Sequence, residues 1–121
     1  MIRHAQMRAL SDNAGRAFED RVFVHLNGCF PNQCRQWGEP EVREWIRYGI
    51  KQASEYGITA QRDVCKYIDL MFVYGHDFDQ DPNLPWASSI LHDRALRDPT
   101  TKLETLYEAG KQRQGGVRNR G

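Results

Sequence analysis

The chain has 121 residues, the size of one domain, and Leu, Ile, Val and Phe together make up 25 of them. Its formal net charge is only +1 at pH 7 and 11% of its residues are aromatic, a balance that excludes an intrinsically disordered chain. The longest apolar run, Leu70 to Tyr74, is far shorter than the roughly 20 residues of a membrane-spanning helix. We therefore expect a soluble, single-domain, cytoplasmic protein whose cysteines, Cys29, Cys34 and Cys65, are free thiols.

Apolar residues recur every three to four positions from the N-terminus and predict a first helix over residues 2–30. Gly15 lowers the helix propensity by about 1 kcal/mol, which leaves room for a bend or a break at this position. Pro31 should end the segment, because a proline pushes the residue before it out of the helical conformation. At about 40 Å, this helix is too long for a compact small bundle to cover completely.

A second helix should start near Pro40, since a proline in the first turn leaves no hydrogen bond unmade. Its apolar stripe runs over residues 42–53, and Gly49 within that stripe indicates a partner helix that approaches closely. Residues 56–58, Tyr-Gly-Ile, are typical of a helix stop in which glycine adopts the left-handed conformation.

Thr59 can cap a third helix, which extends to Gly75 and is apolar nearly all round, as expected in the middle of a bundle. Residues 75–85 form a loop rich in Asp and Pro, after which Pro85 opens a short fourth helix. A fifth helix follows Asp98, a residue type that caps helix N-termini well. The pattern predicts an all-α fold, a single small bundle of about five helices with a disordered basic C-terminal tail.

The C-terminal end differs in composition from the rest of the chain. Residues 111–121 carry four basic side chains and no acidic one, whereas the other 110 residues hold 13 basic and 16 acidic side chains, a net charge of −3. With three glycines and no apolar period, this segment predicts a flexible basic tail on a helical domain over residues 1–110. Four charges without an aromatic platform favour a solvated terminus over a nucleic-acid contact.

Two patterns bear on metal binding. Asp77–Asn83 places oxygen ligands at alternate positions, as calcium loops do, but Pro82 and Ser88 stand where such a loop needs glycine and a bidentate glutamate. Turn formation and helix capping are therefore the favoured roles of these aspartates, and cation binding by the loop stays open. His25 and the three cysteines lack the close cysteine pairs of structural zinc sites.

Signals for catalysis are equally weak, because the chain has no glycine-rich phosphate loop, no nucleophile elbow and no zinc-protease histidine pair. Asp63 and Asp69 lie on the apolar third helix, where structural ion pairs with arginines are favoured over acid–base catalysis. We therefore predict a non-enzymatic protein with no catalytic, cofactor-binding or metal-binding residue.

Large aromatic residues are numerous for a small hydrophilic domain: Trp37, Trp45, Tyr48, Trp86 and Tyr107. Tryptophan and tyrosine dominate the hot spots of protein–protein interfaces. Some of these residues should form the core, and any that lie on the surface would indicate a protein built to hold another protein.

Four segments of the chain resemble one family when they are taken together: IRYGI at 46–50, YGITAQRDVCKYIDLM at 56–71, GHDFD at 75–79 and LPWA at 84–87. The family consists of small proteobacterial proteins encoded beside cargo genes of the type VI secretion system, near PAAR spikes, effectors and their adaptor chaperones. The similarity covers roughly residues 5–110. It implies an accessory, co-chaperone-like role in loading an effector, played in the cytoplasm before export.

An effector that waits for export exposes apolar surface, which a small helical module can cover by helix-in-groove packing. Under this hypothesis we expect the partner, a secretion effector or its adaptor chaperone, to contact the loop 76–87 and the exposed side of the first two helices. Arg43, Trp45 and Trp86 are the predicted partner-binding residues. Two alternatives are a small interaction or regulatory module of another system and a nucleic-acid binder that uses the basic tail.

Overall fold

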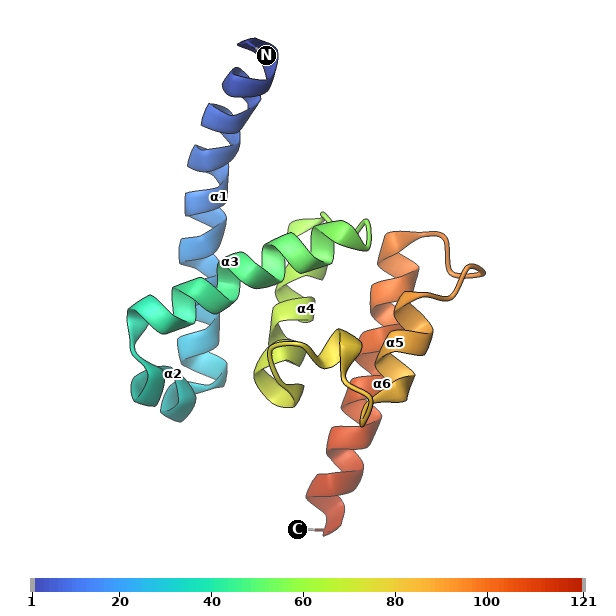
Figure 1. Cartoon of the computed structure of the whole chain (residues 1–121). Helices are drawn as coiled ribbons and strands as arrows, with labels where there is room; N and C mark the ends of the chain where they lie inside the picture. The colour runs from blue at the N-terminus through green and yellow to red at the C-terminus, as the bar shows by residue number, and fades with distance from the viewer. Residues whose placement is uncertain (1, 121) are drawn as a thin grey trace. The chain divides into compact units, whose positions relative to one another are not determined.

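The computed structural model describes the backbone of residues 2–120 and the side chains of residues 15–113. Within residues 2–120 the chain is all-α, as expected, with six α-helices, one 3-10 turn and no strand (Figure 1). None of the described helices has the length and apolarity to cross a membrane. In chain order the elements are α1 (Ile2–Cys29), α2 (Pro31–Trp37), α3 (Glu39–Glu55), α4 (Gln61–Tyr74), η1 (Phe78–Gln80), α5 (Pro85–Leu91) and α6 (Pro99–Arg120).

The chain groups into two compact units, Met1–Arg47 and Tyr48–Gly121, and the division falls inside α3. Helical backbone in α6 extends to Arg120, through most of the segment for which the composition predicts no regular structure. The side chains of residues 114–121 lie outside the described residues. The flexible tail at 111–121 and the domain boundary at residue 110 stay predictions.

The first unit contains α1, α2 and the first half of α3. α1 continues without interruption through Gly15, so the break that this glycine permits does not form. Pro31 does not merely end a helix, because it occupies the first turn of α2, a seven-residue helix that the sequence pattern does not predict. The buried positions follow one face of α1 and continue into α2 and α3: Phe18, Val22, Leu26, Cys34, Val42 and Ile46.

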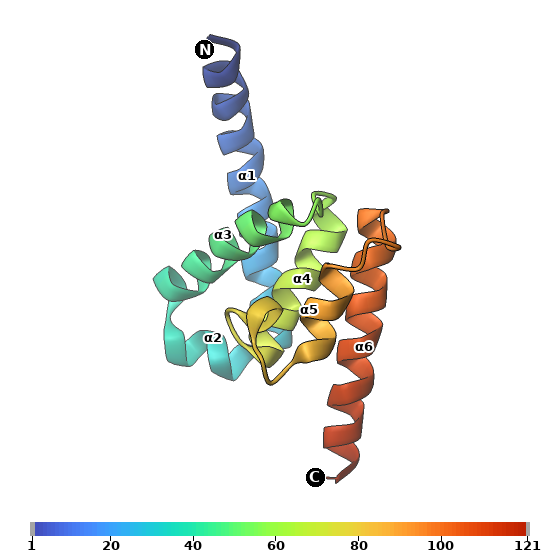
Figure 2. The same cartoon turned by 45° about the vertical axis from the view of Figure 1, so that its right-hand side comes forward.

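In the second unit α6 packs against α4 and α5, and η1 lies against both α4 and α5 (Figure 2). The core consists mainly of aliphatic side chains, and Tyr67 and Phe78 are the largest fully buried ones. Gly49 permits the close helix approach predicted from its place in the stripe. A Cβ atom there would lie 2.6 Å from Ile68 Cγ1 and 2.8 Å from Met71 Sδ, both on α4.

The helix ends confirm some of the expected signals and correct one. Gly57 has a φ of 81°, and the N–H of Ile58 donates to the carbonyl of Ala53, which is the predicted left-handed stop of α3. Asp98 caps α6 by accepting the Thr101 N–H at 3.0 Å. The prediction for Thr59 is wrong, because α4 begins at Gln61, its N-cap is Ala60, and no side chain caps it.

Candidate partner-binding site

Arg43 makes its described contacts inside the first unit. From α3 its guanidinium reaches α1, where Nη1 lies 2.7 Å from Glu19 Oε2 and 2.8 Å from Asp20 Oδ1. Its Nε lies 2.7 Å from Glu39 Oε2 one turn earlier in α3, and its carbon Cζ lies 4.6 Å from the centre of the Phe23 ring. The side chain is only 21% exposed, so most of its surface is used in contacts within the unit. Arg43 therefore joins α1 to α3.

These contacts change the acidity of the buried carboxyl at their centre. Burial alone would raise the pKa of Glu19, but hydrogen bonds and charges from Arg43 and Arg47 outweigh burial and hold that pKa below its ordinary value. The same carboxylates raise the pKa of the Arg43 guanidinium. Glu19 and Arg43 therefore both stay ionised at neutral pH.

Trp45 faces another side of α3, since residues two positions apart in a helix do not share a face. The centroid of its ring lies 4.4 Å from the centroid of the Trp37 ring on α2, at an interplanar angle of 40°. Its indole N–H donates to Glu41 Oε2 at 3.1 Å. Both tryptophans are half-buried, so the pair forms a partly exposed aromatic surface on the first unit.

Trp86 belongs to the second unit, on α5. Its ring makes a T-shaped contact with the Tyr74 ring, with centroids 5.2 Å apart, and the guanidinium carbon of Arg113 lies 5.1 Å from the centre of the Trp86 ring. Trp86 is half-buried like the other two tryptophans. The chain therefore places none of its three tryptophans in the buried core, a distinction that sequence patterns do not make.

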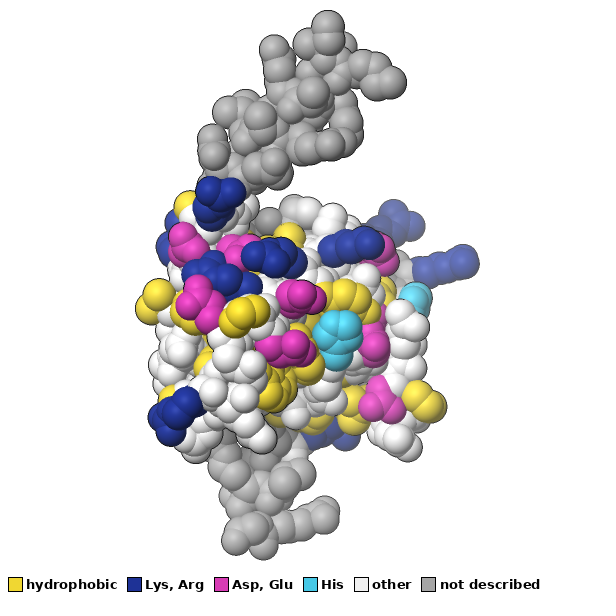
Figure 3. All heavy atoms as spheres, turned by 60° about the vertical axis from the view of Figure 1, so that its left-hand side comes forward, with side chains coloured by type: hydrophobic (Ala, Val, Ile, Leu, Met, Phe, Trp, Pro, Cys, Tyr) yellow, Lys and Arg dark blue, Asp and Glu magenta, His cyan; other side chains and the backbone are white. Residues whose placement is uncertain are grey.

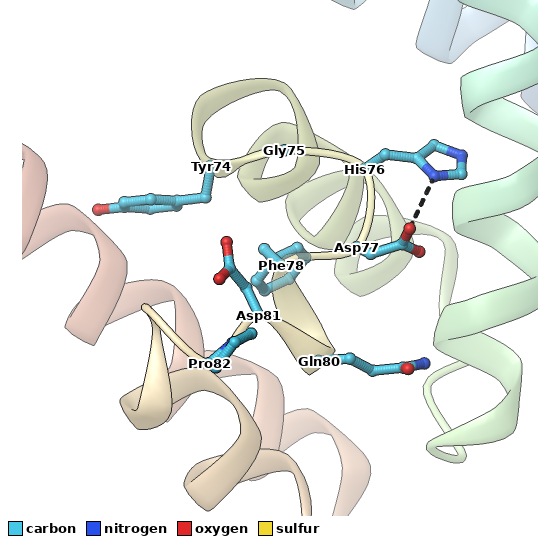
Figure 4. Close-up of a pocket in the computed structure, with 8 residues that line it drawn as sticks. All are labelled: Tyr74, Gly75, His76, Asp77, Phe78, Gln80, Asp81 and Pro82. Carbon is cyan, nitrogen blue, oxygen red and sulfur yellow. Dashed lines mark ion pairs between the residues drawn. The ribbon is translucent and has the colours of Figure 1, made fainter.

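A hollow of about 360 Å³ lies in the second unit where α4 ends and η1 begins (Figure 4). It falls within the loop predicted to contact a partner, although none of the three predicted contact residues lines it. One continuous stretch of chain supplies the wall: Tyr74, Gly75, His76, Asp77, Phe78, Gln80, Asp81 and Pro82.

The three aspartates of this loop have different partners. Asp77 accepts a short hydrogen bond from the hydroxyl of Tyr48, and its Oδ2 lies 3.5 Å from His76 Nδ1. Asp79 is fully buried and accepts the hydroxyl of Tyr56 at 2.6 Å. Asp81 accepts the backbone N–H two residues later at 2.9 Å, which makes an Asx turn. Only Asp81 thus has the predicted use in a turn, whereas Asp77 and Asp79 accept tyrosine hydroxyls, and no side chain caps η1 or α5.

The tyrosines of this cluster hold their protons tightly. The hydrogen bond to Asp77, together with partial burial, raises the pKa of Tyr48 to about 12. Burial and then the bond to Asp79 raise the pKa of Tyr56 above its ordinary value. The second oxygen of Asp79, Oδ1, is buried and has no hydrogen-bond partner among the described residues. These pairs join residues 23 and 29 positions apart, and no local sequence motif marks them.

The cysteines are free thiols, as expected. Cys34 is buried, and burial raises the pKa of its thiol. Cys29 is exposed, with its sulfur 3.8 Å from His25 Nδ1 one turn earlier in α1. A thiol and an imidazole at this distance make a weak contact rather than an assembled nucleophile and base.

On the face drawn in Figure 3, basic and acidic side chains are interspersed, and hydrophobic side chains reach the surface between them. Such a mixed surface suits a protein partner better than a phosphate backbone. Comparisons with protein-family models, curated proteins and solved structures found no match for this chain. The chemistry of the described residues therefore carries the functional proposal.

Proposed function

We propose that this chain is a non-enzymatic accessory protein that binds a type VI secretion effector, or the adaptor chaperone of that effector, in the cytoplasm before export. The family resemblance of segments 46–50, 56–71, 75–79 and 84–87 supports the choice of system. The half-buried state of the tryptophans supports the choice of a protein as the partner.

The placement of the tryptophans is the observation that carries the proposal. A small domain with few aliphatic residues gains most by burying its largest apolar side chains, yet the described core contains phenylalanine and tyrosine but no tryptophan. Half-buried tryptophan is already held in place by its neighbours, as Trp45 is by Trp37, and loses little entropy when a partner covers it. A partner protein that buries the exposed part of these tryptophans would therefore gain hydrophobic free energy at a small cost in entropy.

Capture of the tagged full chain tests the proposal. The chain is co-expressed with the products of the genes that neighbour its own, captured at moderate salt, and the retained proteins are identified by mass spectrometry. We expect an effector or adaptor to be retained, and Trp45→Ala or Trp86→Ala to lower its recovery at least tenfold, as loss of a hot-spot residue does.

Glu104→Ala is the matched control, because Glu104 is exposed on α6, outside the loop 76–87 and the first two helices, and truncation there removes no aromatic ring. It should leave recovery unchanged. Circular dichroism of each variant separates lost binding from lost folding, and Trp45→Phe, which keeps an aromatic ring, should bind better than Trp45→Ala. Retention of neither an effector nor an adaptor, or equal loss with Glu104→Ala, would refute the proposal.

Deletion of residues 111–121 distinguishes the nucleic-acid alternative. An accessory protein that uses its tryptophans should keep its partner without this segment, because Arg43, Trp45 and Trp86 lie outside it and Trp86 loses only its neighbour Arg113 while keeping Tyr74. A nucleic-acid binder would instead lose its ligand on deletion, and its affinity would fall steeply as salt rises.

A further inference from the structure

The hollow at the end of α4 has the dimensions of a site for one side chain. Its volume, about 360 Å³, lies at the small end of the range for ligand sites. Residues 74–82 form its wall, and hydrogen bonds within that stretch hold the wall together. One long side chain of a partner protein fits this space.

The backbone of the wall offers few donors to a ligand. The N–H groups of Gly75, Phe78, Gln80 and Asp81 all donate to carbonyls of residues 71–78, and Pro82 has no N–H. Anions such as phosphate bind where several backbone N–H groups point outward. The ligand of this hollow should therefore bring donors rather than acceptors.

The wall carries acceptors and negative charge. Its ionisable residues are two aspartates and His76, and no Lys or Arg lines it. Asp77 already receives the hydroxyl of Tyr48, whereas Asp81 uses only Oδ1, for the N–H of Asn83. From the described residues Asp81 Oδ2 receives no hydrogen bond, so this charged oxygen is open to a ligand.

Aromatic rings flank this carboxylate. Figure 4 shows the Asp81 carboxylate on the side of the hollow where the Tyr74 ring lies, with Phe78 next to it and Gln80 directed to the opposite side. The Tyr74 hydroxyl donates to the carbonyl of Gly110, which holds the ring in place. Phe78, only 1% exposed, forms an apolar floor. A carboxylate beside an aromatic face matches a cation with an apolar stem.

A nearby contact in the same unit shows the aromatic half of this chemistry, a guanidinium over a ring. The guanidinium of Arg113 lies over the ring of Trp86, whose other neighbour is Tyr74. Arginine suits such sites better than lysine, because its planar guanidinium can stack on a ring while it donates to a carboxylate.

We propose that the hollow binds an arginine side chain of the partner protein, with the guanidinium donating to Asp81 and lying against Tyr74. The inference rests on the proposed function, since it names the part of the partner that the chain recognises. The charge of the wall is complementary to that side chain, and the hollow admits one such residue.

A capped tripeptide with arginine at its centre is the probe. The full-length chain, labelled with nitrogen-15, is titrated with this peptide, and amide chemical shifts are followed by NMR. We expect shifts centred on residues 74–83 with a dissociation constant in the millimolar range, as for one side chain, and none with a peptide in which neutral citrulline replaces arginine.

Asp81→Asn should weaken binding at least threefold, because asparagine keeps the oxygen that holds the Asx turn but removes the charge. Asp93→Asn is the matched control. Asp93 accepts the N–H of Ala95 at 2.9 Å in the same kind of turn, but it does not line the hollow. Equal weakening by the two variants, equal binding of citrulline, or no shift at residues 74–83 would overturn the inference.

The remaining outcomes separate this inference from the proposed function. Should Asp81→Asn still capture an effector or adaptor while the arginine peptide fails to bind, the inference fails and the function stands. Should the peptide bind while no effector or adaptor is captured, the function fails. Concentration-dependent dimerisation that Asp81→Asn abolishes, measured by sedimentation velocity, would identify a basic segment of a second copy as the occupant and overturn the choice of partner.

Discussion

Tyr48 and Tyr56 lie about two helical turns apart along α3 and its end, and each donates its hydroxyl to an aspartate near η1. The two acceptors differ in their access to water. The Asp77 side chain is 59% exposed, whereas Asp79 is completely buried and one of its oxygens has no partner among the described residues. Water can replace a lost donor at Asp77 but not at Asp79.

The two tyrosines should therefore respond differently to loss of the hydroxyl. Tyr56→Phe leaves a buried carboxylate without its donor and should lower the free energy of unfolding by about 1–3 kcal/mol. Tyr48→Phe should lower it by less than about 1 kcal/mol, because water hydrates Asp77 instead. Urea unfolding followed by circular dichroism at pH 7 measures both values. Equal losses in the two variants would contradict the role assigned to burial.

At the scale of elements, α3 and α4 approach each other closely where Gly49 faces Ile68 and Met71. Both neighbours are completely buried, so neither can move aside freely. Helix propensity and packing therefore act in opposite directions at this glycine. Gly15 of α1 differs, because a Cβ there would meet nothing within 4 Å.

These two glycines make a matched pair of substitutions. Gly49→Ala should lower the free energy of unfolding by about 1–3 kcal/mol, because the added methyl group overpacks the contact between the helices. Gly15→Ala should leave it unchanged or raise it by up to about 1 kcal/mol through helix propensity. Chemical unfolding followed by circular dichroism measures both. Stabilisation by Gly49→Ala would show that α4 can move away without cost.

At the scale of the whole molecule, both compact units have an apolar core, but their polar contacts differ. The first contains a cluster of ion pairs in which Glu19 meets Arg43 and Arg47. The second contains tyrosine–aspartate pairs. Acid should therefore weaken the first unit through Glu19, whose side chain is only 12% exposed.

The pH dependence follows from the lowered pKa of Glu19. A carboxyl whose pKa is lowered by folding adds stability that is fully present above its ordinary value, 4.5, and is lost as pH falls through the lower folded value. Glu19→Gln should thus cost about 1–2 kcal/mol at pH 7, and this difference should shrink below about pH 4. Unfolding curves of both proteins across pH 3 to 7 provide the measurement.

Glu108→Gln is the control for this pH series. Glu108 pairs with Lys111 at 3.7 Å, but both side chains are more than half exposed, so its loss should change stability by less than about 0.5 kcal/mol. A difference between wild type and Glu19→Gln that stayed constant down to pH 3 would contradict the ionic role of Glu19.

The helical class and most helix positions could be predicted from the sequence, because helix period, proline in the first turn and the Asp98 cap are local effects. The sequence pattern did not predict α2, because its seven residues are too few to show an apolar period. In addition, Pro31 is a signal both for the end of one helix and for the first turn of the next. Thr59 has the chemistry of a cap, but α4 begins two residues later, at Gln61. Local preference predicts a helix more reliably than its first residue.

The site could be predicted only in part. The sequence alone marked the 76–87 loop and the abundance of aromatic residues. Only the tertiary structure decided that Trp45 and Trp86 lie half-buried, that Arg43 is paired with Glu19, and that Asp81 lines a hollow. The physical reason is distance along the chain. Helix formation depends on residues within one or two turns, whereas burial and pairing depend on side chains that folding brings together from far apart.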